Sequence, residues 1–175
     1  MIKTIKENDE VLYPKDEMVM VDAPSLDELK RLAKLNTRLR IRLCAHHSSQ
    51  EDVHEMIIFH PKGTYVRPHK HLGKDESFHL IFGEIDCVIF DDHGSITKNF
   101  MMGNYSSRKT FYYRIPANTY HMQIFKKDTF FHEVTKGPFD RHDTINASWA
   151  PDEKDTTMVK NYINDIIQTI NSIKS

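Results

Sequence analysis

Between about residues 38 and 135 the chain is a succession of short β-rich runs separated by turn signals, and this pattern limits the fold more than any other feature. Polar and apolar residues alternate in RLRIRLCA (38–45), and short apolar runs follow, such as EMIIFH (55–60) and YHMQIF (120–125). Glycine, proline, asparagine and aspartate punctuate the runs, as in the turn at 61–63. No helical pattern interrupts them, which disfavours a parallel sheet built from βαβ units. We therefore expect a mainly β fold, a sandwich or a small barrel.

Helical patterns flank this β region. Ser25 and Glu28 form a capping-box pattern, and leucines spaced three or four residues apart predict a helix over 26–36. The C-terminal residues repeat apolar side chains at the same spacing, which predicts an amphipathic helix. We interpret its apolar stripe as packing across the outer face of the β domain, with a subunit interface as the alternative. The predicted segments are an N-terminal strand and helix (1–37), a metal-binding barrel (38–150) and the C-terminal helix (151–175).

The N-terminal segment carries two weaker signals. Short strands are predicted at 1–6 and 17–21. The basic run RLAKLNTRLRIR (31–42) is interpreted as the solvated face of a helix rather than as an anion-binding site.

Composition excludes several classes of protein. The chain has 175 residues, of which 39% are hydrophobic, as in an ordinary globular domain. Its net charge is −1, so it lacks the basic excess of a nucleic-acid-binding protein. No apolar stretch resembles a leader or a membrane span, so we expect a cytoplasmic protein without a membrane partner. Cys44 and Cys87 are far apart and are expected to be buried, reduced thiols.

Histidine is the compositional anomaly, with eleven copies, and several crowd into GTYVRPHKHLGKDESFHLIFG (63–83). Alternation along a strand sends His69 and His71 to the same side. A tight turn then leads to Glu76 at the start of the next strand, so a two-stranded pair is expected to bring the three groups together. His79 has the opposite parity to Glu76 and should face away. His60 ends an earlier strand, where it can approach the rim of a pocket.

Written out, the run is G-x5-H-x-H-x4-E-x6-G, and IPANTYHMQIF (115–125) follows it later in the chain. The two stretches resemble the conserved motifs of the cupin superfamily. The resemblance implies a single antiparallel barrel, also called a double-stranded β-helix or jelly roll, that holds one divalent metal ion. The second motif departs from the pattern at Thr110 and Asn118, where the family has glycine, and at Phe125, where it often has asparagine. The implied metal ligands are His69, His71, Glu76 and His121.

Longer blocks look like the WbuC family of cupin-fold metalloproteins, over about residues 40–153. These blocks include RLCAHHSS, EMIIFHPKGTYVRPHKH, ESFHLIFGEIDCVIFDDHG, FYYRIPANTYH and SWAPDE. That family is associated with gene clusters for O-antigen and other surface polysaccharides. The resemblance implies fold, metal and pathway context but no mechanism. As the leading function we expect a metal-dependent enzyme that acts on a sugar or nucleotide sugar by isomerisation, epimerisation or another proton transfer. The alternatives are an Fe(II)-dependent oxygenase and a non-catalytic metal- or sugar-binding module. Because cupins often pair through their sheets, a homodimer is also expected.

Three imidazoles and one carboxylate suit divalent Fe, Mn, Ni, Co or Zn. An octahedral ion with four protein ligands keeps two positions open, and a fold of this size does not need a structural metal, so we favour a functional ion. Residues of the same parity as the ligands are expected to line the cavity. Tyr65 and Tyr113 are candidate catalytic acids, with simple filling of the barrel as the alternative. Arg67 and Gln123 are candidate substrate-binding residues, and for Arg67 a salt-bridged surface role is the alternative.

Overall fold

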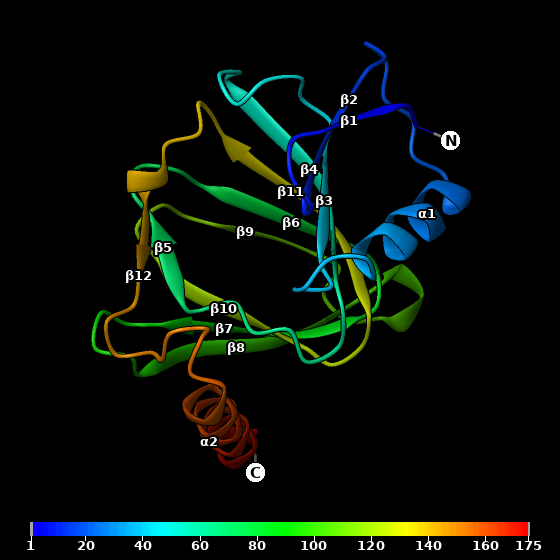
Figure 1. Ribbon diagram of the computed structural model, residues 1–175. Coiled ribbons are helices and arrows are strands. Elements are labelled where there is room, and N and C mark those ends of the chain that lie inside the picture. The colour runs from blue at the N-terminus through cyan, green and yellow to red at the C-terminus, as the bar shows by residue number, and fades with distance from the viewer. Residues whose placement is uncertain (1, 175) are drawn as a thin grey trace.

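The computed structural model describes residues 2–174 and consists mainly of two β-sheets packed face to face (Figure 1). The first sheet has the spatial order β1 (Thr4–Lys6), β2 (Val11–Pro14), β3 (Ile41–Cys44), β4 (Val53–His60), β11 (Thr129–Lys136), β6 (Glu76–Phe82) and β9 (Tyr112–Ile115). The second has the order β12 (Thr144–Asn146), β5 (His69–His71), β10 (Tyr120–Phe125), β7 (Glu84–Phe90) and β8 (Ile96–Gly103). The other elements are helices α1 (Ala23–Ala33) and α2 (Thr156–Lys174) and the 3₁₀ turns η1 (Tyr105–Ser107) and η2 (Arg141–Asp143).

The main core lies between the two sheets. Strand alternation turns Met56, Phe78 and Leu80 of the first sheet inward, where they meet Cys87 and Phe125 of the second. Neighbouring strands are antiparallel except for β2 and β3, which run parallel. This sandwich of the jelly-roll type is the mainly β fold that the short alternating runs predict. Both cysteines are buried and free, as expected.

The two helices cover the outer faces of different sheets (Figure 1). Leu29 and Ala33 of α1 pack on Ile41 and Leu43 of β3. Ile166 and Ile170 of α2 belong to the apolar cluster on the second sheet, with Val88, Phe90, Tyr120, Met122 and Ile124. The predicted packing of the C-terminal helix across the outside of the β domain is therefore confirmed.

The N-terminal helix begins three residues earlier than predicted. Asp22, rather than Ser25, is its N-cap, and the Asp22 carboxylate accepts a hydrogen bond from the Ser25 backbone N–H at 3.0 Å. Pro24 fits the first turn, where its missing N–H costs nothing. The capping-box interpretation of Ser25 was wrong, because Asp22 is an equally good N-cap, is followed by Pro24 in the first turn, and starts the helix before Ser25 is reached.

The strand predictions failed mainly at the edges of the sheets. Residues 17–21 form no strand, whereas β2, β8 and β12 were not predicted. In β8 most side chains are partly or fully exposed, so the edge strand lacks the alternation that marks a half-buried one. β1 lies within the strand predicted at 1–6. Met1 of that predicted strand and Ser175 of the predicted C-terminal helix lie outside the described residues.

Candidate metal centre

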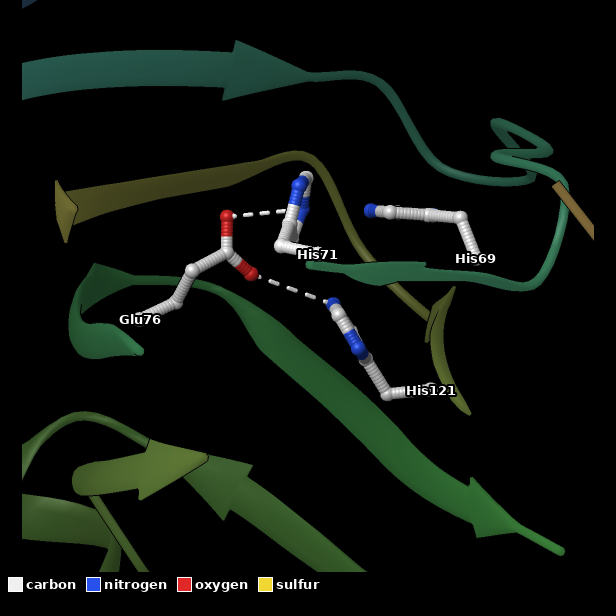
Figure 2. A group of neighbouring side chains, drawn as sticks. All are labelled: His69, His71, Glu76 and His121. Carbon is white, nitrogen blue, oxygen red and sulfur yellow. Dashed lines mark ion pairs between the residues drawn. The ribbon is translucent and has the colours of Figure 1, made fainter. Parts of the chain in front are cut away.

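The four residues that the cupin resemblance points to lie together, and they come from both sheets (Figure 2). His69 and His71 are on β5, and His121 is on β10, where it pairs directly with His69. Glu76 opens β6 in the other sheet. One potential ligand atom from each residue lies within 4.8 Å of the other three. The centre thus lies where the two layers face each other at one end of the sandwich.

The expected pairing of the two motif strands is wrong. β5 pairs with β10 and β12, and β6 pairs with β11 and β9, so the turn between them crosses from one sheet to the other. Gly73 has a φ of +67° in this turn, a conformation that glycine adopts easily. The crossing places the Glu76 carboxylate opposite the imidazoles, rather than beside them, so that the four groups surround one point.

Hydrogen bonds fix which nitrogen of each imidazole faces that point. Nδ1 of His69 lies 2.8 Å from the Arg67 carbonyl oxygen, and Nδ1 of His121 lies 3.0 Å from the Thr119 carbonyl oxygen. A carbonyl only accepts hydrogen bonds, so both Nδ1 atoms carry the proton and both Nε2 atoms present a lone pair. Nδ1 of His71 lies 3.1 Å from the Thr144 hydroxyl. Metal-binding histidines are commonly oriented in this way by their second nitrogen.

The inward-facing atoms have no hydrogen-bond partner among the described residues. They are Nε2 of His71 and of His121, and Oε2 of Glu76. Nε2 of His71 lies 3.0 Å from Oε1 of Glu76, and Nε2 of His121 lies 3.2 Å from Oε2 (Figure 2). Lone pairs that face each other at this distance repel unless a cation lies between them. One proton relieves only one contact, whereas one metal ion accepts electron pairs from all four residues, so the donor set fits a divalent transition metal ion.

Burial and the neighbouring groups keep His69 and Glu76 in the protonation states that metal binding requires. Burial lowers the pKa of His69 to about 3, so its imidazole is neutral at pH 7. Burial raises the pKa of Glu76, but the adjacent His121 and His71 outweigh this effect and hold the pKa below its usual value. The centre therefore presents a neutral His69 imidazole and an ionised Glu76 carboxylate.

A cavity of about 290 Å³ opens beside the centre. His69, His71 and Glu76 line it together with apolar side chains of the inner faces, among them Phe78. Gln123 lines it as well, so the alternation of side chains along β10 places this predicted substrate-binding residue in the cavity. The remaining polar lining is formed by Glu10, Arg38, Arg40, Arg42, His60, Glu133 and Thr144.

The other predicted residues lie farther from this cavity. Tyr113 is in the core, stacked on Phe78 with ring centroids 5.0 Å apart, and its hydroxyl accepts a hydrogen bond of 2.9 Å from Nε2 of Gln123. Tyr65 donates a hydrogen bond of 3.0 Å to the Pro151 carbonyl oxygen and packs near Tyr162 of α2. The structure thus connects Tyr113 to the cavity only through Gln123, and it does not bring Tyr65 to the centre.

Arg67 holds a neighbouring loop. Its guanidinium donates two hydrogen bonds, of 3.1 and 2.7 Å, to the Ala147 carbonyl oxygen and lies 3.6 Å from the Asp152 carboxylate. Residues 64–68 form no strand, so alternation counted back from His69 does not apply to Tyr65 or Arg67. His79, by contrast, is exposed on the outer face of β6, as its parity predicts.

Sequence reasoning missed Glu133 and misjudged the basic run. Glu133 lies on the inner face of β11, two residues from Phe131, and this inward parity was the available signal. Burial, reinforced by the charge of Glu76, raises the pKa of Glu133 to about 8. The interpretation of residues 31–42 as a solvated helix face was wrong for the second half of the run. α1 ends at Ala33, and three arginines beyond it line the cavity.

His60 gives the metal-free protein a specific acid sensitivity. Its ring stacks on Phe125 with centroids 4.7 Å apart, and burial lowers its pKa to about 3 from the ordinary 6.5. Between these pH values the unfolded chain binds a proton at His60 that the folded chain does not. As far as this residue is concerned, the free energy of unfolding is therefore highest above pH 6.5 and falls as the pH drops. We expect this residue alone to cost about 2 kcal/mol between pH 6.5 and pH 5.

Urea unfolding of metal-free protein at the two pH values measures this loss. His60→Phe should remove the contribution of about 2 kcal/mol, because phenylalanine keeps the aromatic stack and has no group to protonate. The exposed His47→Phe serves as the control and should keep the full acid loss. Equal acid loss in His60→Phe and His47→Phe would contradict the prediction.

Comparison with known proteins supports the fold. A family described as "Domain of unknown function (DUF6016)" matches residues 21–102. No curated protein matches the chain significantly. Among solved structures, protein SO0799 from Shewanella oneidensis is similar over 73% of this chain and 85% of its own, with 13% identity and a TM-score of 0.52.

Two other proteins of known structure have weaker similarity. Oxalate decarboxylase from Bacillus subtilis is 19% identical over 55% of this chain, with a TM-score of 0.44, and the match covers 24% of the decarboxylase chain. CapF, determined with the inhibitor 3-isopropenyl-tropolone, is 14% identical over 61% of this chain and 30% of its own, with a TM-score of 0.47. The chain has a jelly-roll-type sandwich fold with four side chains that can hold a metal ion. No helix within residues 2–174 is both long and apolar enough to cross a membrane.

Proposed function

We propose that this chain is a divalent-metal-dependent enzyme that binds its ion with His69, His71, Glu76 and His121 and moves a proton on a sugar-type substrate. The observation that carries the proposal is the convergence of unpartnered Nε2 and carboxylate atoms on one point beside a cavity. The fold can be stable without a metal at this length, because its core lies between two complete sheets, so a functional ion is favoured over a structural one.

When bound, the ion supplies Lewis-acid chemistry, polarising a carbonyl or hydroxyl oxygen of the substrate. Glu133 is placed to exchange the proton, because its pKa of about 8 lets it act as acid or base near neutral pH. Gln123 can orient a substrate oxygen, with its amide held by the Tyr113 hydroxyl. Phe78 and the apolar lining limit the access of water. In this proposal Tyr113 positions Gln123 and does not touch the substrate.

The finer part of the proposal is membership of the WbuC family and a role in surface-polysaccharide or O-antigen synthesis. It rests on the sequence blocks between residues 40 and 153 that look like that family. A sugar or nucleotide sugar is then the substrate class. Formation of a homodimer and the identity of the ion among Fe, Mn, Ni, Co and Zn stay predictions.

Two measurements on natively purified protein test the proposal. Elemental analysis should find about one transition metal ion per chain. Incubation with candidate nucleotide sugars in D₂O should place deuterium at an exchangeable carbon position, detected by mass spectrometry, and Glu133→Gln should abolish the exchange. Oxygen uptake with bound iron would favour the oxygenase alternative. Sugar binding that survives metal removal, without any exchange, would favour a non-catalytic module.

A further inference from the structure

Three arginines at alternate positions, Arg38, Arg40 and Arg42, line the cavity that contains the metal centre. Ile41 and Leu43 of β3 face outward and are buried against α1. Alternation therefore turns Arg40 and Arg42 to the opposite side, toward the second sheet. We refer to the three residues as the arginine cluster. None of them belongs to the metal-ligand group, by which we mean His69, His71, Glu76 and His121.

Arg42 lacks a counterion in the described part of the chain. The only hydrogen bond of its side chain there is a weak one, 3.5 Å from Nη1 to the sulfur of Met56, and no carboxylate oxygen lies within 4.0 Å of its guanidinium. Glu133, an acidic residue of the same cavity, lies on β11, beyond β4. A partly buried guanidinium without an anion keeps unused donors and an uncompensated charge, so an oxyanion in the cavity would be bound favourably.

Arg38 and Arg40 lie farther out, at the mouth. Both reach Oε2 of Glu10, at 3.3 and 3.2 Å, and both reach Oε2 of Glu153, at 2.8 and 3.7 Å. The two carboxylates balance these two arginines and hold them at the mouth, so the cluster as a whole keeps one excess positive charge, that of Arg42. The guanidinium forks remain free to form further bonds, because each ion pair uses few of their donors.

The cavity also continues outward past the cluster. An adjoining cavity of about 660 Å³ shares Arg38, His69 and Thr144 with the first, and its other charged residues are two cations and two carboxylates, Arg67, Lys154, Asp152 and Glu153. A ligand with one end at the metal centre can therefore extend past the arginine cluster toward solvent. Bidentate recognition of planar or tetrahedral oxyanions is what arginine does better than lysine.

We propose that the arginine cluster binds an oxyanion, a carboxylate or phosphate group, on the ligand that the cavity accepts. The inference rests on the proposed function only in placing the other end of that ligand at the metal centre. It makes the substrate class an anionic small molecule rather than a neutral sugar.

Calorimetric titration of pyrophosphate and of succinate into metal-free protein at low ionic strength tests the inference, and the two anions distinguish a phosphate from a carboxylate ligand. At least one should bind. Arg42→Gln and Arg40→Gln should each weaken binding about tenfold or more, because each removes charge-assisted hydrogen bonds. Arg31→Gln is the matched control, because Arg31 pairs with Glu28 on the exposed face of α1, and it should leave binding unchanged.

The inference fails if neither anion binds the unmodified protein, or if Arg42→Gln and Arg31→Gln bind alike. Should Arg42→Gln lack a native circular dichroism spectrum, Arg42→Lys and Arg40→Gln decide. Arg42→Lys keeps the charge but not the fork, so it should also bind more weakly than the control. Metal content is measured separately on each variant. Because the anion is titrated into metal-free protein, the inference about anion binding holds even if the proposed enzyme function is wrong. A variant that loses only metal binding does not contradict the inference.

Discussion

Replacing Glu76 with glutamine lowers the affinity of the protein for a divalent metal ion by more than about 100-fold. Glutamine keeps the shape of the side chain but removes the only negative charge of the group, which Glu76 presents to His71 and His121 at 3.0 and 3.2 Å. Residues that merely orient a ligand cost about 10- to 100-fold when replaced, so a direct ligand should cost more. Titration of chelator-treated protein with Zn²⁺ and with Mn²⁺ measures the effect.

Glu133→Gln is the matched control for this prediction. Glu133 lines the same cavity and is also a buried carboxyl, but it lies outside the metal-ligand group. Its replacement should change metal affinity by less than about tenfold. Equal losses in the two variants would mean that the cavity attracts cations by its general charge and not through the four-residue centre.

The histidines allow an independent form of the same test. His121 is 2% exposed and faces the centre, whereas His79 is exposed on the outer face of β6. His121→Gln should abolish stoichiometric metal binding, and His79→Gln should retain it. A thermal melt separates the two causes of failure, because a folded His121→Gln that no longer gains stability from added metal has lost the site and not the fold. Stoichiometric metal in a folded His121→Gln would remove that residue from the ligand set.

The sequence predicted the convergence of most of the four candidate ligands because their spacing is local. His69 and His71 need only the alternation of one strand, and Glu76 needs only a turn. The fourth residue, His121, could be joined to them only through the cupin resemblance, since its contact with His69 depends on the pairing of β5 with β10. Pairing between distant strands is not encoded in local alternation, and for the same reason the crossing of the turn from one sheet to the other was not foreseen.

The rest of the cavity was harder to predict, because its residues come from strands whose inward face is not evident in the sequence. Alternation failed for Tyr65 and Arg67, where the chain before Pro68 is not a strand. The arginine cluster was hidden because its alternating pattern is also that of a half-buried strand with a solvated face. Only the packing of Ile41 on α1 decides which side of β3 faces the second sheet.

Gly83→Ala should destabilise the protein by about 3 kcal/mol or more, far beyond the effect of Gly63→Ala. The two glycines stand at opposite ends of the sequence motif, and both have a positive φ, +108° at Gly83 and +80° at Gly63. A Cβ on Gly83 would lie 2.5 Å from Oγ1 of Thr129 and 2.6 Å from the Asp128 carbonyl oxygen, whereas one on Gly63 would meet nothing within 4 Å. Gly63→Ala thus carries only the conformational penalty of about 1 to 2 kcal/mol.

Urea unfolding of the two variants in metal-free form measures the difference. If both lose the same free energy, the close approach of Gly83 to the turn before β11 is not what requires glycine there, and backbone conformation alone accounts for both positions. The folded fraction of Gly83→Ala should still bind one metal ion, because the centre lies at the opposite end of β6, where Glu76 begins the strand. Glycine is therefore required at the two motif positions for different physical reasons. At Gly63 the reason is backbone conformation, and at Gly83 it is the packing of two turns.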